Sequence, residues 1–583
     1  MSPSFPPGSR PPEPEPNPSG PHARASGRDV LRATVRGQRR AVVLGALLGA
    51  GHQAGEALVP VLIGVVVDRA VTGSDTGALL RWLLVLAVVY AGLALSYRFG
   101  AWSGERAAAR AEHSLRLALV RRVLHPRGGA EEGRLPGALA TVATEDAKRV
   151  GAVNLALMFG VSALAGIATC AVVLLRTSVV LGLVVLLGTP VLLWLGHLLG
   201  KPLESRSEAE QERAAHASAV AADLVAGLRI LKGIGGEPAA VARYRATSRD
   251  SLRATLRAAR AQAFQSGVVL ALTGCLIAAV ALVGGRLAAE GSISLGQLVS
   301  AVGLALFLLG PLEVLAWANA ELAQGRASAT RIAEVLSAPP AVTAGRTSLP
   351  QPVRGAVRLS GVSHGGLREV DLDIAPGELL GVVATDPAHA TALLHCLARR
   401  TDPEAGAVEL DGVPLRDLDP AELWAALLVA DHDADLFEGT VRGNVTAAAP
   451  ASADPDAAMA AAGVAQVVRA LPDGEDTAVS ERGRSLSGGQ RQRVALARAL
   501  AADRPVLVVH DPTTAVDTVT EARIAAGLRE IRKGRTTVLV TTSPALLAVT
   551  DRVVLLDDGR VTDSASHAEL IRRHETYRSA VLA

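Results

Sequence analysis

Residues 485–500, SLSGGQRQRVALARAL, carry the residue types that allow a helix to bind an anion at its first turn. Ser487, Gly488 and Gly489 open the predicted helix, where free backbone N–H groups and the positive end of the helix dipole are available. Glycine at these positions lets an anion approach the backbone closely. The stretch therefore predicts an anion-binding helix terminus.

A second stretch, PVLVVHDPTTAVD at 505–517, reads as a buried strand followed by acidic and hydroxyl side chains. Both stretches lie in a C-terminal half that starts near residue 345 with strand-like alternation in AVRLSGVSH and LREVDLDI. Apolar strands followed by helices then repeat, which is typical of an α/β domain.

The N-terminal half has a different composition. The 583-residue chain is 49% hydrophobic and only 20% charged, and long charge-poor runs fill residues 41–324. A membrane-spanning helix needs about 20 apolar residues. Six segments qualify: 41–68, 78–103, 150–175, 177–199, 263–288 and 294–320.

Basic residues orient these six spans. Arginines cluster before the first span, at positions 28, 32, 36, 39 and 40, and basic connections occupy 106–149 and 201–262. The positive-inside rule places these segments in the cytoplasm, together with both chain termini. The inner connections are long and helical in period, so we expect spans two to five to extend beyond the membrane.

Other classes of function find little support in the sequence. A formal net charge of +3 gives no electrostatic footprint for nucleic acid. Cys170, Cys275 and Cys396 are scattered, which predicts neither a disulfide framework nor a metal site. Residues 1–27 are rich in Pro, Ser and Gly, and we expect them to be disordered.

The two C-terminal motifs, with DGVPLRDLDP (411–420), LFEGTVRGNV (436–445) and SERG (480–483), resemble the exporter branch of the ATP-binding-cassette (ABC) transporter family. The resemblance covers nearly the whole chain after the N-terminus. It implies a six-span transmembrane domain at 28–335, a linker at 336–350 and a P-loop-NTPase-like nucleotide-binding domain at 351–583. It also implies coupling turns near Glu112–Leu119 and Ala217–Val225.

In this family two nucleotide-binding domains enclose ATP and Mg²⁺ head to tail, each nucleotide lying between one phosphate loop and the partner's LSGGQ. The resemblance assigns the LSGGQ role to Ser487, Gly488, Gly489 and Gln490, and the cross-dimer aspartate to Asp517. All of these residues match the family pattern.

The phosphate loop departs from that pattern. GELLGVVATDPAHATALLHCL aligns without gaps on the family's loop, placing Pro387 and His389 on glycines, Ala390 on the lysine and Thr391 on the hydroxyl residue. Proline removes a backbone donor, and Asp386 brings a negative charge toward a polyphosphate. The loop is therefore predicted to be hostile to phosphate.

Further departures fall on the same ATP site. The resemblance places His510 on the magnesium-side aspartate, Asp511 on the catalytic glutamate, His432 on the glutamine and Ser543 on the switch histidine. The segment VSHGGLREV also lacks the family's adenine-stacking aromatic residue. We therefore predict a catalytically impaired site.

An intact LSGGQ beside an impaired phosphate loop predicts the degenerate half of a heterodimeric transporter in the cytoplasmic membrane. Its partner would be a second half-transporter with intact Walker A and B motifs, and its cargo a small molecule, lipid or peptide. Two alternatives stay open: a non-transporting membrane regulator that uses a pseudo-ATPase domain, and an active homodimeric ATPase.

Ionisable residues inside predicted spans are candidates for substrate contact. These are His52, Glu56, Arg98 and Glu313. His52 and Glu56 are four residues apart and can share one helix face, so a helix-packing pair is the alternative reading. The sequence does not name the cargo.

Overall fold

The computed structural model describes residues 26–71, 76–343, 345–432 and 435–582. The chain forms two compact units, one made of residues up to 120 and 136–337, the other of 121–135 and 338 onward. Most of the predicted disordered segment, 1–25, lies outside the described residues. Gly27 already begins a helix, capped by the Ser26 side chain.

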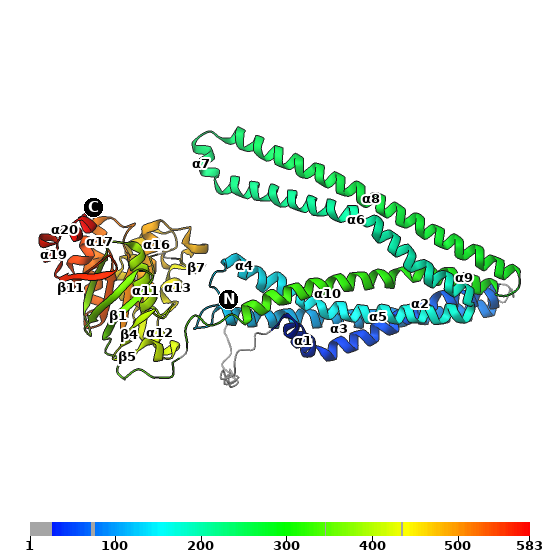
Figure 1. Ribbon diagram of the computed structural model, residues 1–583, viewed down its shortest axis with the longest axis horizontal. Helices are drawn as coiled ribbons and strands as arrows, with labels where there is room; N and C mark the ends of the chain where they lie inside the picture. The colour runs from blue at the N-terminus through cyan, green and yellow to red at the C-terminus, as the bar shows by residue number, and fades with distance from the viewer. Residues whose placement is uncertain (1–25, 72–75, 344, 433–434, 583) are drawn as a thin grey trace. The chain divides into compact units, whose positions relative to one another are not determined.

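The first unit is helical (Figure 1). Its α-helices are α1 Gly27–Gly37, α2 Arg39–Val66, α3 Thr76–Val123, α4 Pro136–Thr141, α5 Ala147–Thr177, α6 Val179–Ala226, α7 Leu228–Gly233, α8 Glu237–Ala289, α9 Leu295–Phe307 and α10 Leu309–Leu336. Single π-helical turns, η1 Val67–Val71 and η2 Val142–Asp146, adjoin α2 and α5. Within this unit α2 packs on α5 and α9, and α5 packs on α10.

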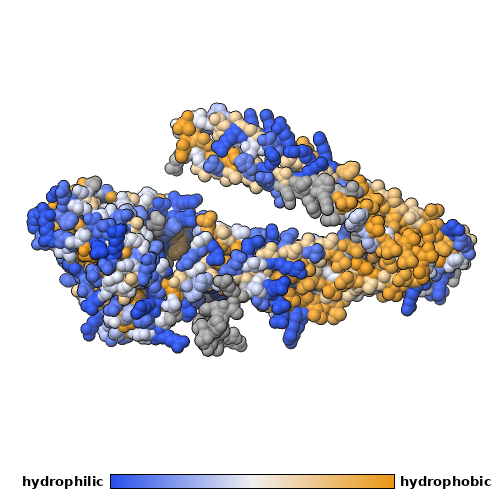
Figure 2. Space-filling view, viewed as in Figure 1, coloured by the Kyte–Doolittle hydropathy of each residue, from blue (hydrophilic) through white to orange (hydrophobic). Residues whose placement is uncertain are grey.

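All six predicted spans fall on helices. Among the described residues, five helical stretches are long and apolar enough to cross a membrane: Arg39–Ala70, Thr76–Val123, Pro136–Thr177, Glu237–Ala289 and Leu295–Leu336. The predicted span 177–199 falls mainly on the start of α6, where a shorter apolar run covers Val179–Leu192. Figure 2 shows apolar side chains gathered over part of this helical unit. Leu84 and Leu270 are among its exposed apolar residues.

Helices α6 and α8 form a long hairpin that leaves the other helices of the unit, with α7 at its tip (Figure 1). The predicted positions of the two inner turns were wrong. Residues 112–119 are still helical in α3, and residues 217–225 are still in α6. The chain turns later, at 124–135 and at 227–236, because the helical pattern continues through the predicted points.

The second unit contains two main sheets. An antiparallel sheet has the order β2-β1-β4-β5, and a mostly parallel sheet has the order β12-β11-β3-β10-β9-β6. The strands of the first sheet are β1 Val357–His364, β2 Leu367–Ile374, β4 Ala405–Leu410 and β5 Val413–Pro414. Those of the second are β3 Leu379–Ala384, β6 Leu427–Ala430, β9 Val506–His510, β10 Thr536–Val540, β11 Arg552–Asp557 and β12 Arg560–Ala565. A small pair, β7 Gly439–Thr440 and β8 Ala478–Val479, lies apart.

The α-helices of this unit are α11 Pro387–Leu397, α12 Pro420–Ala426, α13 Val441–Thr446, α14 Pro455–Ala461, α15 Val464–Ala470, α16 Gly488–Ala501, α17 Thr518–Ile531, α18 Pro544–Ala548, α19 His567–Arg573 and α20 Glu575–Leu582. Short 3₁₀ turns occupy Leu415–Asp417, Gly474–Asp476 and Glu481–Gly483.

The parallel sheet positions the candidate site. Strand β10 is buried along its whole length and β9 along all but its last residue, as expected for a sheet covered on both faces. Strands β3, β10, β9 and β6 are parallel neighbours, so their carboxyl ends meet at one edge. Ligands of open α/β sheets bind at this edge.

Candidate nucleotide site

Most of the residues predicted for the chain's own nucleotide site come together at this edge. Residues 385–391 follow β3, His510 ends β9 and Asp511 comes next. Ser543 follows β10, and His432 follows β6. The sequence alignment and the topology therefore agree on where these residues lie.

The N-terminus of α11, where a phosphate would bind, is capped by the protein's own carboxylate. Asp386 is the N-cap, and its Oδ1 accepts a hydrogen bond from the Ala388 N–H at 2.8 Å. Pro387, the first helical residue, has no N–H to offer. The positive end of this helix therefore already faces a negative charge.

The connection before α11 is short and tied down. Only Thr385 and Asp386 separate β3 from α11. The Thr385 hydroxyl donates to Asp557 Oδ1 at 2.7 Å, and its N–H donates to the Leu556 carbonyl at 3.1 Å. The start of this connection is therefore fixed to β11.

The two side chains at the lysine and hydroxyl positions of the family loop are also unavailable for phosphate. Ala390 is only 4% exposed and belongs to the hydrophobic core. The Thr391 hydroxyl donates to the Pro387 carbonyl at 3.0 Å. The hydroxyl that survives in the sequence is thus used within its own helix.

The hairpin between β1 and β2 closes against the same helix. His364 pairs with Leu367, so the turn contains only Gly365 and Gly366, whose φ angles of 52° and 98° favour glycine. A Cβ on Gly366 would lie 3.0 Å from His389 Cδ2. The turn therefore packs on the His389 ring and offers no Phe, Tyr or Trp for stacking on a base.

The side chains that follow β9 and β10 contact neighbouring side chains. His510 Nε2 lies 3.7 Å from Asp511 Oδ2, and Asp511 has a left-handed φ of 41°. The Ser543 hydroxyl caps α18 and donates to Glu521 Oε1 at 2.8 Å. The polar groups of His510, Asp511 and Ser543 are thus engaged in contacts within the domain.

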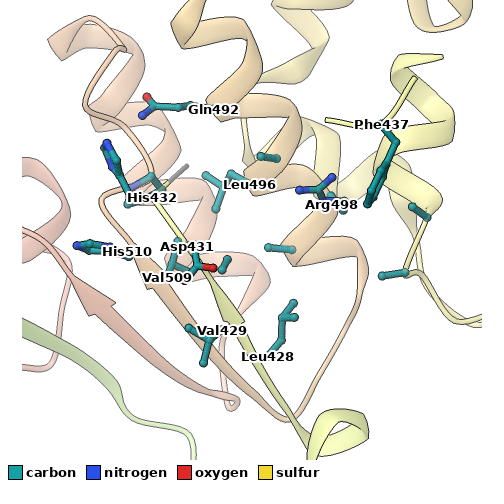
Figure 3. Close-up of a pocket in the computed structure, with 16 residues that line it drawn as sticks. Leu428, Val429, Asp431, His432, Phe437, Gln492, Leu496, Arg498, Val509 and His510 are labelled. Atoms are coloured by element: carbon teal, nitrogen blue, oxygen red, sulfur yellow. The ribbon is translucent and has the colours of Figure 1, made fainter. Parts of the chain in front are cut away.

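His432 and His510 line one pocket of about 330 Å³, with ring centroids 5.8 Å apart. Figure 3 shows them at one end of the pocket, with Arg498 and Phe437 at the other. The Arg498 guanidinium lies 5.4 Å from the centre of the Phe437 ring. Burial lowers the pKa of Arg498. Phe437 and Arg498 lie in LFEGTVRGNV and in the LSGGQ stretch, but neither motif predicts a role for them.

The α16 terminus is built differently. The Ser487 hydroxyl accepts from the Gln490 N–H, and the Gln490 amide oxygen accepts from the Ser487 N–H at 2.8 Å. This capping box satisfies the first turn with uncharged groups. The capping box therefore contains no carboxylate that would offset the positive end of the α16 dipole. A helix start of this kind can accept an anion.

The glycines of this motif are required by packing as well. A Cβ on Gly489 would lie 2.5 Å from the Ala515 carbonyl oxygen, and one on Gly488 would lie 3.3 Å from Ala515 Cβ. The Gln492 side chain accepts from the Ala515 N–H at 2.9 Å. Helix α16 and the segment before Asp517 are therefore held as one piece.

Asp517 caps α17. Its carboxylate accepts from the Thr520 N–H at 2.9 Å, and this bond lowers the pKa of Asp517. The side chain is therefore ionised at neutral pH and fixed in direction.

The structure also shows the surroundings of the four candidate residues in the predicted spans. His52 Nε2 lies 3.6 Å from Glu56 Oε2, and His52 Nδ1 lies 2.9 Å from the Leu93 carbonyl oxygen. Glu56 and Glu313 line one cavity of the helical unit, whereas Arg98, exposed on α3, does not line it. The structure thus brings two of the four candidates to one cavity.

A unit of membrane-length helices and an α/β domain with a glycine-rich helix start are thus joined in one chain. Residues 42–312 match the family described as ABC transporter transmembrane region, and residues 367–514 match the family described as ABC transporter. The chain belongs to the ABC transporter family and carries both of these matched regions. The predicted family and fold class are confirmed, and ATP with Mg²⁺ is the nucleotide that this family membership implies.

Relatives of known name agree with this assignment. The chain is 32% identical over 560 residues to a multidrug efflux ATP-binding/permease protein of Mycobacterium tuberculosis, covering 94% of this chain and 46% of the relative. The chain thus spans about half the length of that relative. It is 30% identical over 387 residues to an ATP-dependent lipid A-core flippase of Thiobacillus denitrificans, covering 65% of this chain and 67% of the relative.

A solved structure supports the fold. The chain resembles a bacterial Atm1-family ABC exporter with ATP bound, with a TM-score of 0.71, 24% identity, and coverage of 94% of this chain and 98% of that chain.

Proposed function

We propose that this chain is the degenerate subunit of a heterodimeric, ATP-driven exporter in the cytoplasmic membrane, with both termini in the cytoplasm. Its α16 terminus would complete an ATP site built on the phosphate loop of a partner half-transporter. Its own site, around Ala390, Thr391 and His510, would hydrolyse no ATP. The cargo would be a small molecule, lipid or peptide.

One contrast carries this proposal. Helices α11 and α16 both start at positions where the family binds phosphate, but a carboxylate caps α11 and a serine hydroxyl caps α16. An anion at α11 would meet the charge of Asp386, whereas one at α16 would meet N–H groups and glycines. A homodimer would combine two impaired phosphate loops, so the chain needs a different partner.

The roles of the individual residues follow from this contrast. Ser487, Gly488, Gly489 and Gln490 would face the partner's ATP, with Asp517 beside the dimer contact. His432, Asp511 and Ser543 occupy family positions without supplying the usual chemistry. Magnesium would be held mainly at the partner's phosphate loop, because His510 replaces the carboxylate on this side.

Two further observations favour a paired arrangement. The mycobacterial multidrug efflux relative is about twice as long as the matched stretch, which leaves room for a second half in the same chain. The α6–α8 hairpin ends in exposed apolar side chains, namely Leu228, Ile230 and Ile234, which a partner's nucleotide-binding domain would cover. The names of the relatives, multidrug efflux and lipid A-core flippase, favour amphiphilic cargo.

The proposal is tested by co-expressing this chain with a half-transporter of the same genome that carries intact Walker A and B motifs. We expect the two chains to co-purify and to hydrolyse ATP together, and to move cargo in inside-out vesicles. A pair that hydrolyses ATP without moving any cargo would favour the regulator alternative. Robust ATP turnover by this chain alone would favour the homodimer.

A further inference from the structure

A cavity of about 520 Å³ opens between α2, α9 and α10 of the helical unit. Its wall includes Gln53 and Glu56 from α2, Phe307 from α9, and Glu313 and Trp317 from α10. Its size is that of a cavity for a drug-sized molecule. All of these residues lie within the predicted first and last spans.

The ionised groups in the wall carry one sign of charge. Two carboxylates, Glu56 and Glu313, line the cavity, and no Lys, Arg or His is among its lining residues. Glu56 has His52 at 3.6 Å, while Glu313 has no ion-pair partner among the described residues of this unit. Carboxylates within spans are costly and mark sites where a cation is bound or passes.

The uncharged groups of the wall suit the same kind of ligand. The Trp317 ring packs edge-on against Phe159, with centroids 6.1 Å apart at 75°, and is 42% exposed. An aromatic face next to carboxylates binds organic cations through cation–π attraction.

The distribution of charge separates the two kinds of cargo that the relatives' names offer. A phosphorylated headgroup such as that of lipid A would meet two carboxylates and no basic side chain in this wall. An amphiphilic amine or quaternary cation would instead meet charge complementarity and an apolar surface. Arg98, the only arginine among the candidates in the spans, lies outside the cavity wall.

We propose that this cavity is a cargo site for amphiphilic organic cations, in which Glu56 and Glu313 bind the positive charge and Trp317 and Phe307 bind the apolar body. This inference rests on the proposed function as an exporter and specifies its cargo class. The carboxylates confer specificity for charge, and the rings supply contact area that tolerates different shapes.

The test uses the full-length chain in phosphatidylcholine nanodiscs, without nucleotide or partner. Binding of radiolabelled tetraphenylphosphonium is compared with binding of tetraphenylborate, an ion of nearly the same size and shape but opposite charge. Empty nanodiscs correct for partition into lipid. We expect saturable binding of the cation only.

Three variants locate the site. Glu56→Gln and Glu313→Gln should each weaken cation binding about tenfold or more, because each removes one of the two negative charges in the cavity wall. Glu313→Asp keeps the charge and should retain most of the affinity. Glu321→Gln, on α10 but outside the cavity wall, is the matched control and should bind like the unchanged chain.

The inference is overturned if the unchanged chain shows no saturable cation binding, if both ions bind equally, or if Glu313→Gln binds as tightly as Glu321→Gln. Thermal unfolding of each variant distinguishes lost binding from lost folding, and Glu56→Gln tests the role of the charge if Glu313→Gln does not fold. Since the test needs neither ATP nor a partner, its failure is distinguishable from failure of the proposed heterodimer.

Discussion

The Asp386 carboxylate accepts a hydrogen bond from the Ala388 N–H at 2.8 Å, and so occupies the helix terminus where a nucleotide phosphate would otherwise bind. An acidic N-cap stabilises its helix by about 0.5–2 kcal/mol. A phosphate must displace this carboxylate and also overcome its charge. Under the proposed function, the same carboxylate would both stabilise the domain and exclude a nucleotide phosphate.

The isolated chain is expected to hydrolyse no ATP above background. Ala390 supplies no ammonium group, His510 supplies no magnesium carboxylate, and the β1–β2 turn supplies no aromatic face for adenine. Malachite-green phosphate release from the purified, partner-free chain is the measurement. Magnesium-dependent turnover that resists further purification would contradict this prediction.

Replacing Asp386 by Ala should destabilise the start of α11. The loss of an N-cap costs about 1 kcal/mol, so amide exchange at His389 and Ala390 should speed up several-fold. Asp386→Asn keeps an acceptor without the charge and is the matched control, with a smaller effect. Equal exchange in all three proteins would mean that the carboxylate does not cap the helix in solution.

Restoring His389→Gly and Ala390→Lys together should not revive hydrolysis at this site. Pro387 still lacks its N–H, Asp386 still caps the helix, and Lys at position 390 would have to leave a core where Ala390 is 4% exposed. Catalytic groups that act as a unit are not recovered singly. The readout is ATPase activity in a pair whose partner carries an inactivated catalytic glutamate. Substantial activity there would show that the alignment at His510 and Asp511 is wrong.

The tip of the α6–α8 hairpin should matter for coupling. Ile230 is 70% exposed on α7, and Ile230→Asp removes apolar area that a partner domain would cover. We expect cargo transport by the pair to fall at least about fivefold while the helical unit stays folded, as for loss of a buried apolar contact. Lys232→Asp, on the same short helix, introduces a negative side chain without removing apolar surface and should act more weakly. Full transport by the Ile230 variant would exclude this surface from coupling.

Local patterns made much of this fold predictable. The alternating residues of LREVDLDI form β2 over the predicted range, and the Ser487 signature starts α16 as expected. Each of these signals is contained within a few neighbouring residues. The long inner helices were recognised as helical, but their turns were predicted too early because the helical pattern of α3 and α6 extends through the predicted turn positions.

Contacts between distant segments were not predictable from one sequence. The approach of Gly366 to His389, the fit of Gly489 against Ala515 and the shared cavity of Glu56 and Glu313 each join residues far apart in the chain. Asp386 was predicted to repel phosphate, but its role as the N-cap of α11 depends on where β3 ends. Such relationships depend on backbone geometry that composition and spacing leave open.

The central claim is that this chain contributes its α16 terminus to a partner's ATP site and contributes no chemistry at its own. The most direct measurement is steady-state ATP turnover by the reconstituted pair, with Gly488→Arg and Asp511→Asn introduced separately into this chain. We predict a loss of about 100-fold or more for Gly488→Arg, because groups that face developing charge contribute that much to the rate. Asp511→Asn should leave turnover within about twofold, since no step at this site depends on it. Turnover abolished by Asp511→Asn and unaffected by Gly488→Arg would contradict the account.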